Sequence, residues 1–150
     1  MILMIGYGNP LRSDDAIGQH MAEMMEQCLK PEMVQVITTY QLTPELVEPI
    51  QRAELVVFID ARVGQRPGKV VWENVKPEIS TGAFTHHVTP GTLLGAADVL
   101  YAAKPEGILI SIVGADFDYG SDLSDQLKRM LPEIAAQVEA IIKMNVKVAT

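Results

Sequence analysis

The chain has 150 residues, about the length of one domain, with 48% hydrophobic and 21% charged residues, close to the average for globular proteins. This composition excludes a mainly disordered chain, because disordered segments carry too few apolar residues to build a core. The formal net charge is -7, and the sequence shows no cluster of three basic residues. Because nucleic-acid binding requires a basic surface, we do not expect nucleic acid as a partner.

The start of the chain and its cysteine content indicate the compartment. The apolar run at residues 1–10 is about half as long as a membrane-spanning helix, and it lacks a basic leader and a cleavage site. The one cysteine, Cys28, cannot form an internal disulfide, and a four-cysteine zinc site is impossible. We therefore expect a cytoplasmic protein without a membrane span, and a monomer.

In the first third of the chain, two strands alternate with two helices. Residues 2–5 form a short apolar run that predicts a buried strand, and the turn at residues 6–10 ends it. A helix capped by Asp14 or Asp15 is expected next, ending before Pro31. Its apolar positions, at helical spacing, are Ile17, Met21, Met24, Met25 and Cys28. Residues 34–38 predict a second strand, and the Thr43 hydroxyl is expected to cap a second helix.

The remainder of the chain continues this alternation. Residues 55–59 are uniformly apolar up to Asp60, which is typical of a central parallel strand. Residues 70–72 predict a short edge strand, and residues 108–113 predict another buried one. A third helix begins at residues 89–90, with an apolar side of Leu93, Leu94, Ala97, Leu100 and Tyr101. A last helix runs from residue 121 to about residue 144, and Pro132 is expected to kink or split it.

This order predicts a single α/β domain over residues 1–150, with a largely parallel twisted sheet of about five strands and helices on both faces. Ligands of such sheets bind beyond the carboxyl ends of the strands. The loop at residues 6–18 has a glycine turn there, but it matches neither Gly-x-Gly-x-x-Gly nor Gly-Lys-Ser/Thr, so a phosphate site is not indicated.

Two carboxylates stand out at this edge of the sheet. One of Asp14 and Asp15 suffices to cap the first helix, and the other has either the same role or a chemical one. Asp60 directly follows five apolar residues. It either caps the loop that follows or serves as a ligand or acid/base group facing the same crevice.

His86 and His87 stand side by side before the third helix. Histidine is the commonest metal ligand, but the side chains of adjacent residues diverge, so one of the two is expected to point into the crevice. Two carboxylates and one imidazole from three loops suit a transition metal such as zinc or nickel and leave coordination positions open. Cys28 is expected on the buried side of its helix, so thiol catalysis is not indicated.

Three segments in this order resemble the hydrogenase maturation endopeptidase family: GYGNPLRSDDAIG at 6–18, IDA at 59–61 and THHVTP at 85–90. The resemblance extends over nearly the whole chain. It implies an enzyme that removes a C-terminal extension from the large-subunit precursor of nickel–iron hydrogenases after nickel has been loaded. In family terms, the catalytic and metal-binding residues are Asp15, Asp60 and His87.

The resemblance also implies the ligand and the supporting residues. The metal is the nickel of the substrate precursor, with zinc or another divalent metal as an alternative, and no organic cofactor is expected. Gly8, Asn9, Gln41 and His86 are the expected substrate-binding residues, His86 also being the alternative ligand, and Asp14 is assigned to helix capping. The segment QLTPEL at 41–46 resembles the subgroup associated with bidirectional, NAD-linked hydrogenases.

Two other functions remain open at this point. A nickel-site chaperone or inactive relative would bind the same precursor through the same residues without cutting it. A peptidyl-tRNA hydrolase also opens with a strand and a Gly-Asn-Pro turn, but it requires a basic tRNA surface and a histidine–asparagine pair soon after that turn. This chain has Arg12-Ser13-Asp14-Asp15 there.

Overall fold

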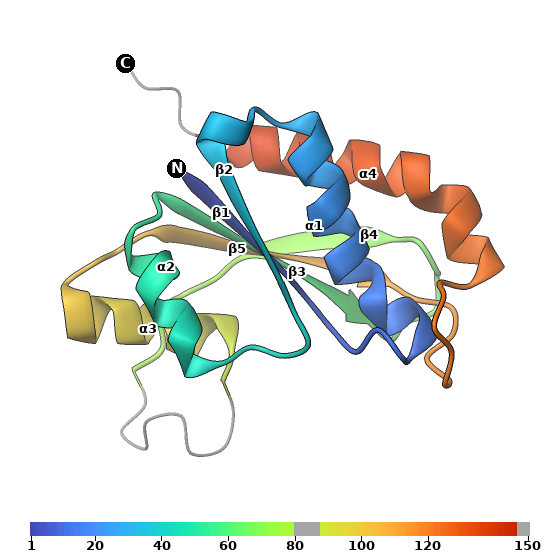
Figure 1. Cartoon of the computed structure of the whole chain (residues 1–150), viewed down its shortest axis with the longest axis horizontal. Coiled ribbons are helices and arrows are strands. Elements are labelled where there is room, and N and C mark those ends of the chain that lie inside the picture. Colours follow the sequence, from blue (N-terminus) through green and yellow to red (C-terminus); the bar gives the residue numbers. More distant parts are fainter. Residues whose placement is uncertain (80–87, 147–150) are drawn as a thin grey trace.

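Five strands form one sheet in the order β2-β1-β3-β5-β4 in the computed structural model, which describes residues 1–79 and 88–146 (Figure 1). All neighbouring strands are parallel except β4 and β5, which are antiparallel. The α/β fold with a largely parallel sheet is thus confirmed, with β4 at an edge as predicted. Strand β3 continues to Arg62 instead of ending before Asp60. The strands are β1 Ile2–Tyr7, β2 Val34–Thr39, β3 Leu55–Arg62, β4 Val70–Asn74 and β5 Glu106–Val113.

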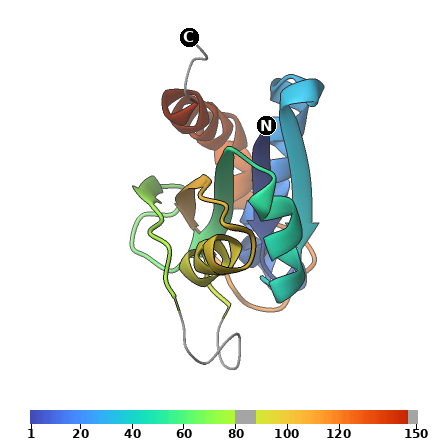
Figure 2. The same cartoon turned by 90° about the vertical axis from the view of Figure 1, so that its left-hand side faces the viewer.

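Helices cover both faces of the sheet, α1 and α4 one face and α2 and α3 the other (Figures 1 and 2). Thr89 caps α3 by accepting a hydrogen bond from the backbone N–H of Thr92, and Ser124 caps α4 in the same way through Leu127. No helix in the described ranges is long and apolar enough to cross a bilayer. The helices are α1 Ile17–Cys28, α2 Val47–Gln51, α3 Pro90–Tyr101 and α4 Asp125–Asn145, with short 3-10 helices η1 Ser13–Ala16, η2 Pro31–Met33 and η3 Pro44–Leu46.

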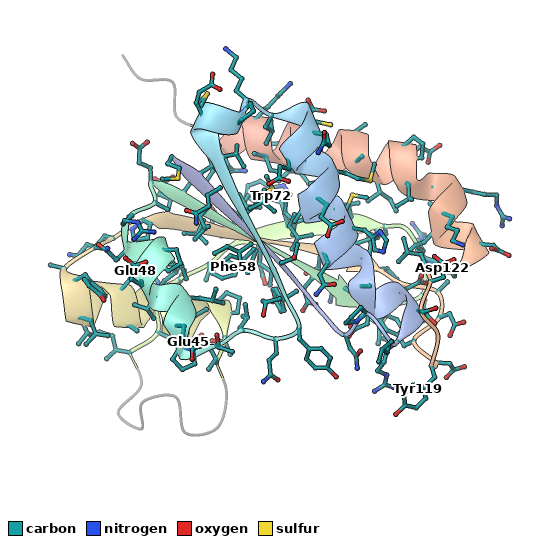
Figure 3. The ribbon with its side chains drawn as sticks, in the orientation of Figure 1. Glu45, Glu48, Phe58, Trp72, Tyr119 and Asp122 are labelled. Carbon is teal, nitrogen blue, oxygen red and sulfur yellow. The ribbon has the colours of Figure 1, made fainter. Side chains whose placement is uncertain are left out.

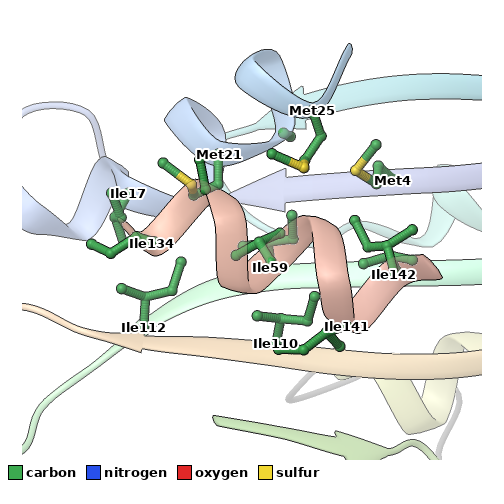
Figure 4. Close-up of a cluster of buried hydrophobic side chains, with 14 of the residues drawn as sticks. Met4, Ile17, Met21, Met25, Ile59, Ile110, Ile112, Ile134, Ile141 and Ile142 are labelled. Carbon is green, nitrogen blue, oxygen red and sulfur yellow. The ribbon is translucent and has the colours of Figure 1, made fainter. Parts of the chain in front are cut away.

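Alternate side chains of each central strand enter two separate cores, as the two-residue period of a strand requires. Met4 and Ile59 pack with α1 and α4 in a core rich in isoleucine and methionine (Figure 4). Ile5 and Phe58 pack with α2 and α3 on the opposite face, and Phe58 lies at the centre of the molecule (Figure 3). The central strands are therefore buried on both sides, which explains their uniformly apolar sequence.

Several local expectations were wrong. Cys28, Leu100 and Tyr101 are exposed, because burial ends about one turn before α1 and α3 themselves end. Thr43 makes no capping hydrogen bond. Pro132 lies inside one uninterrupted helix, on its exposed side, so it does not split α4, and the alternative of a kink stays a prediction.

The N-terminal turn of α1 lies directly against the carboxyl ends of β1 and β3. A Cβ atom on Gly18 would overlap the backbone carbonyl oxygen of Ile59, and one on Gly6 would overlap the carbonyl oxygen of Gly18. Both obstacles are backbone atoms of buried elements, which cannot move aside without shifting the helix. The absence of a side chain at these two positions therefore determines how close α1 comes to the sheet.

We predict that Gly18→Ala lowers the free energy of unfolding by about 1–3 kcal/mol through overpacking. Gly64→Ala is the matched control, because a Cβ there would meet only the Val113 methyl groups at 3.2 Å. It is expected to change stability by less than about 1 kcal/mol. Urea denaturation of both variants measures the difference, and equal stability of the two variants would contradict this account of the helix–sheet contact.

Candidate active site

A pocket of about 510 Å³ opens at the carboxyl ends of the strands. It lies where the strand order reverses, at the junction of β1 and β3, the place where doubly wound sheets bind ligands. We call it the carboxylate pocket, because its lining brings Asp15 and Asp60 together. The lining residues are Tyr7, Gly8, Asp15, Tyr40, Gln41, Leu42, Asp60, Val88, Thr89 and Pro90.

The turn between β1 and η1 positions Asp15. Its Oδ2 atom accepts a hydrogen bond from the backbone N–H of Asn9 at 2.7 Å. Gly8 has a φ of +148°, and a Cβ atom there would overlap the carbonyl oxygen of Asp15. Gly8 and Asn9 thus shape the turn that holds Asp15. Their role in substrate binding stays a prediction.

Asp60 is half-buried within β3, and its Oδ1 atom accepts a hydrogen bond from the N–H of Ala61 at 2.8 Å. Burial raises the pKa of Asp60 from its ordinary 3.8 to about 6, and the negative charge of Asp15 adds to this rise. Hydrogen bonds from Ala61 and Tyr7 act in the opposite direction and only partly offset it. A carboxyl group with this pKa can change its protonation state near neutral pH.

Tyr7 is a site residue that the sequence reasoning did not single out. Burial, followed by the negative charge of Asp60, raises the pKa of the Tyr7 hydroxyl. The hydroxyl therefore stays protonated and donates a hydrogen bond to Asp60. The alternation along β1 was the available signal, because Leu3 and Ile5 share one face of the strand with Tyr7.

Asp14 does not cap the first helix, which corrects the sequence assignment. Neither η1 nor α1 has a side-chain cap. Asp14 is instead fully buried at 0% exposure, and its carboxylate accepts hydrogen bonds from the backbone N–H groups of Ala115, Asp116 and Ser124 and from the Ser124 hydroxyl, at 2.7–2.9 Å. It fastens η1 to the loop between β5 and α4.

Two polar side chains support the wall of the pocket. Gln19 donates from Nε2 to the carbonyl oxygens of Gly8 and Thr39, at 3.2 and 2.7 Å. Asn9 donates from Nδ2 to the Tyr40 hydroxyl at 2.7 Å. These bonds join the loops after β1 and β2. Gln41 lines the pocket, and its role in substrate binding stays a prediction.

The two predicted histidines, His86 and His87, lie outside the described residues. Val88 and Thr89, which follow them in the chain, line the carboxylate pocket. Among the described residues, no group of three potential ligands is arranged to hold a metal. Two carboxylates suit a divalent cation but do not complete the predicted set of ligands. The metal-binding role of Asp15 and Asp60 stays a prediction.

Comparison with known proteins confirms the resemblance read from the sequence. The chain is 26% identical over 149 residues to hydrogenase 2 maturation protease from Escherichia coli, covering 95% of this chain and 90% of that protein. The structure of the hydrogenase maturating endopeptidase HybD from E. coli superimposes with a TM-score of 0.68 at 25% identity, covering 95% of this chain and 92% of that one.

A second structure extends the likeness in fold. The nickel–iron hydrogenase maturation protease HycI from Thermococcus kodakarensis superimposes with a TM-score of 0.71 at 22% identity, again covering 95% and 92% of the two chains. No family model matches the sequence. The chain therefore has the fold of hydrogenase maturation endopeptidases and resembles them along nearly its whole length.

We predict that Asp14→Asn destabilises the fold by about 2 kcal/mol or more, because an amide nitrogen cannot accept the hydrogen bonds that the second carboxylate oxygen receives. Asp116→Asn is the control. It keeps the oxygen that accepts a bond from the N–H of Asp118 at 2.9 Å, and we expect a change within about 0.5 kcal/mol. Chemical denaturation compares the two, and two equally stable variants would refute the anchoring role of Asp14.

The raised pKa of Asp60 predicts a pH-dependent effect of Asp60→Asn. Between pH 3.8 and about 6, the folded protein keeps a proton that the unfolded chain has released, so the wild type loses stability as the pH rises through this window. Asparagine carries no charge, so this loss does not occur in the variant. Above pH 6, its free energy of unfolding is expected to exceed that of the wild type by about 1–3 kcal/mol. Denaturation at pH 4 and pH 7.5 tests this, and a stability difference that is independent of pH would contradict it.

Proposed function

We propose that this chain is a hydrogenase maturation endopeptidase that removes the C-terminal extension of a nickel-loaded nickel–iron hydrogenase large-subunit precursor. The names of its relatives support the enzyme class, and similarity along nearly the whole chain supports the same overall reaction. The observation that carries the proposal is the pairing of Asp15 and Asp60 in one pocket, at the point of the sheet where ligands bind.

The electrostatics of the pair favour a cationic ligand. The negative charge of Asp15 raises the cost of ionising Asp60, as its contribution to the raised pKa of Asp60 shows. A divalent cation between them removes this repulsion and allows both groups to be charged. The nickel of the precursor supplies such a cation as part of the substrate, so the pair would favour the loaded precursor over the empty one.

The proposed nickel recognition also gives the site a way to act on a peptide bond. A metal ion held by carboxylates can polarise a nearby carbonyl oxygen and so promote attack by water. In this proposal Asp15 and Asp60 position the nickel, and Tyr7 and the N–H groups of Asn9 and Ala61 orient the two carboxylates. His87, or His86 in its place, is the proposed third ligand.

An in-vitro processing assay tests the proposal. The purified protein is mixed with nickel-loaded and nickel-free precursors, including one from a bidirectional NAD-linked hydrogenase, and the loss of C-terminal mass is recorded. We expect processing only with nickel, and about a 100-fold or larger loss of processing in Asp15→Asn and Asp60→Asn. Asp116→Asn serves as the control and is expected to process at the wild-type rate.

Three results would overturn parts of the proposal. Tight binding of the loaded precursor without mass loss, across all precursors, would favour a chaperone over a protease. Equal processing of loaded and empty precursors would refute nickel recognition. Wild-type processing by folded Asp60→Asn would remove Asp60 from the site.

A further inference from the structure

A second pocket, of about 320 Å³, lies at the carboxyl end of β3 and has three cationic residues in its lining. Its lining includes Arg62, Arg66 and Lys69, together with Val63, Gly64, Gln65, Val71 and Val113. We call it the cationic pocket. It corrects the sequence-based statement that no three basic residues cluster, because strand β3 and the turn that follows it bring three cations together within eight residues.

A tight turn sets the spacing of two of these cations. The N–H of Lys69 donates to the carbonyl oxygen of Arg66 at 3.0 Å, Pro67 follows Arg66, and Gly68 has a φ of +89°. These features define a type II turn, which keeps its first and last residues within about 7 Å of each other. Hydrogen bonds join the turn to β5, from Gly68 N–H to the Val113 carbonyl at 2.7 Å and from Val113 N–H to the Lys69 carbonyl at 3.0 Å.

The three cations lack acidic partners in the part of the chain that the structure describes. The ion pairs found there are those of Arg52, Lys128, Lys143 and the N-terminal amine, and none includes a cation of this pocket. In a protein with a net charge of -7, three exposed positive groups that form no ion pair with a described carboxylate make an attractive site for an anion.

The cationic pocket is adjacent to the carboxylate pocket along one strand. Asp60 and Arg62 are two residues apart on β3, so their side chains point to the same face of the sheet, and their Cα atoms are about 6–7 Å apart. Val113 of the cationic pocket belongs to β5, which pairs with β3, and Val71 belongs to β4, which pairs with β5 at the same end of the sheet. An extended peptide that crosses both pockets needs about two residues to span the distance from Asp60 to Arg62.

We propose that Arg62, Arg66 and Lys69 bind a carboxylate of the substrate peptide, about two residues from the bond that is cut. This inference rests on the proposed endopeptidase function and adds a specificity site to it. The carboxylate belongs either to an acidic side chain near the cleavage point or to the C-terminus of the extension. Arginine and lysine hydrogen-bond carboxylates with charge assistance, which makes them suitable for this recognition.

The double variant Arg66→Gln/Lys69→Gln tests the site, because it removes two cations and leaves Asp15, Asp60 and Arg62 in place. Lys30→Gln/Lys104→Gln is the matched control. It removes the same charge from exposed residues that line other pockets. With the nickel-loaded precursor, we expect the first variant to raise KM about tenfold, with kcat within about twofold of wild type, and the control to match the wild type.

A binding assay separates this inference from the proposed function. Fluorescence anisotropy measures binding of a peptide spanning the cleavage point and the extension to the non-processing Asp60→Asn protein, with and without Arg66→Gln/Lys69→Gln. We expect weaker peptide binding in the combined variant and a loss of affinity as salt rises in Asp60→Asn alone. A peptide with an amidated C-terminus shows whether the terminal carboxylate binds the pocket. A peptide whose acidic side chains are replaced by amides shows whether a side-chain carboxylate does.

The outcomes distinguish the two ideas. If the wild type processes the precursor while Arg66→Gln/Lys69→Gln leaves both KM and peptide binding unchanged, the proposed role of the cationic pocket is overturned and the protease function stands. Failure of the wild type to process any precursor, while the peptide still binds through these cations, overturns the protease and leaves the pocket. If the Lys30→Gln/Lys104→Gln control weakens substrate binding equally, the effect comes from overall charge, and the specific site is overturned.

Discussion

The contact between the backbone of α1 and the carboxyl ends of β1 and β3 is the constraint on which the site depends. Gly6 and Gly18 allow this contact because neither carries a side chain between helix and sheet. The preceding turn is then short, and it places Asp15 over the edge of the sheet that Asp60 occupies from β3. Asp14 fastens the same turn from its other side to the loop before α4. Neighbouring aspartates therefore have separate roles, one structural and one facing the pocket.

Holding two carboxylates together costs stability, and the structure shows where that cost is partly offset. The N–H groups of Asn9 and Ala61 each donate to one carboxylate, and the Tyr7 hydroxyl donates to Asp60. These bonds stabilise the charged forms but leave the pKa of Asp60 raised. A protein selected for stability alone would place an apolar or neutral residue at position 60 of β3. The persistent electrostatic cost is typical of sites where function is favoured over stability.

The sequence predicted what depends on local pattern and missed what depends on distant partners. Apolar runs located the strands, and the rule for parallel sheets alone placed Asp15 and Asp60 at one edge. The role of Asp14 was assigned wrongly because its partners are about 100 residues away, and a helix cap is the local interpretation of an aspartate there. The cationic pocket was missed for a related reason. Arg62 reaches it from a strand and Lys69 from a turn, so their spacing in sequence shows no regular period.

The opposite charges of the two pockets suggest how a small site can be selective. Along β3, a pair of carboxylates and a group of cations lie within about two residues of each other. A ligand that offers only a cation is attracted to the carboxylate pocket and repelled by the cationic pocket. A ligand that offers only an anion is attracted to the cationic pocket and repelled by the carboxylate pocket. Both pockets are satisfied by a ligand that carries positive charge and a carboxylate at matching separation, such as a metal-loaded peptide. Under the proposed function, free metal ions and unloaded peptides would each lack one of these features, so the two pockets together would reject both through unpaired charge as well as through missing contacts.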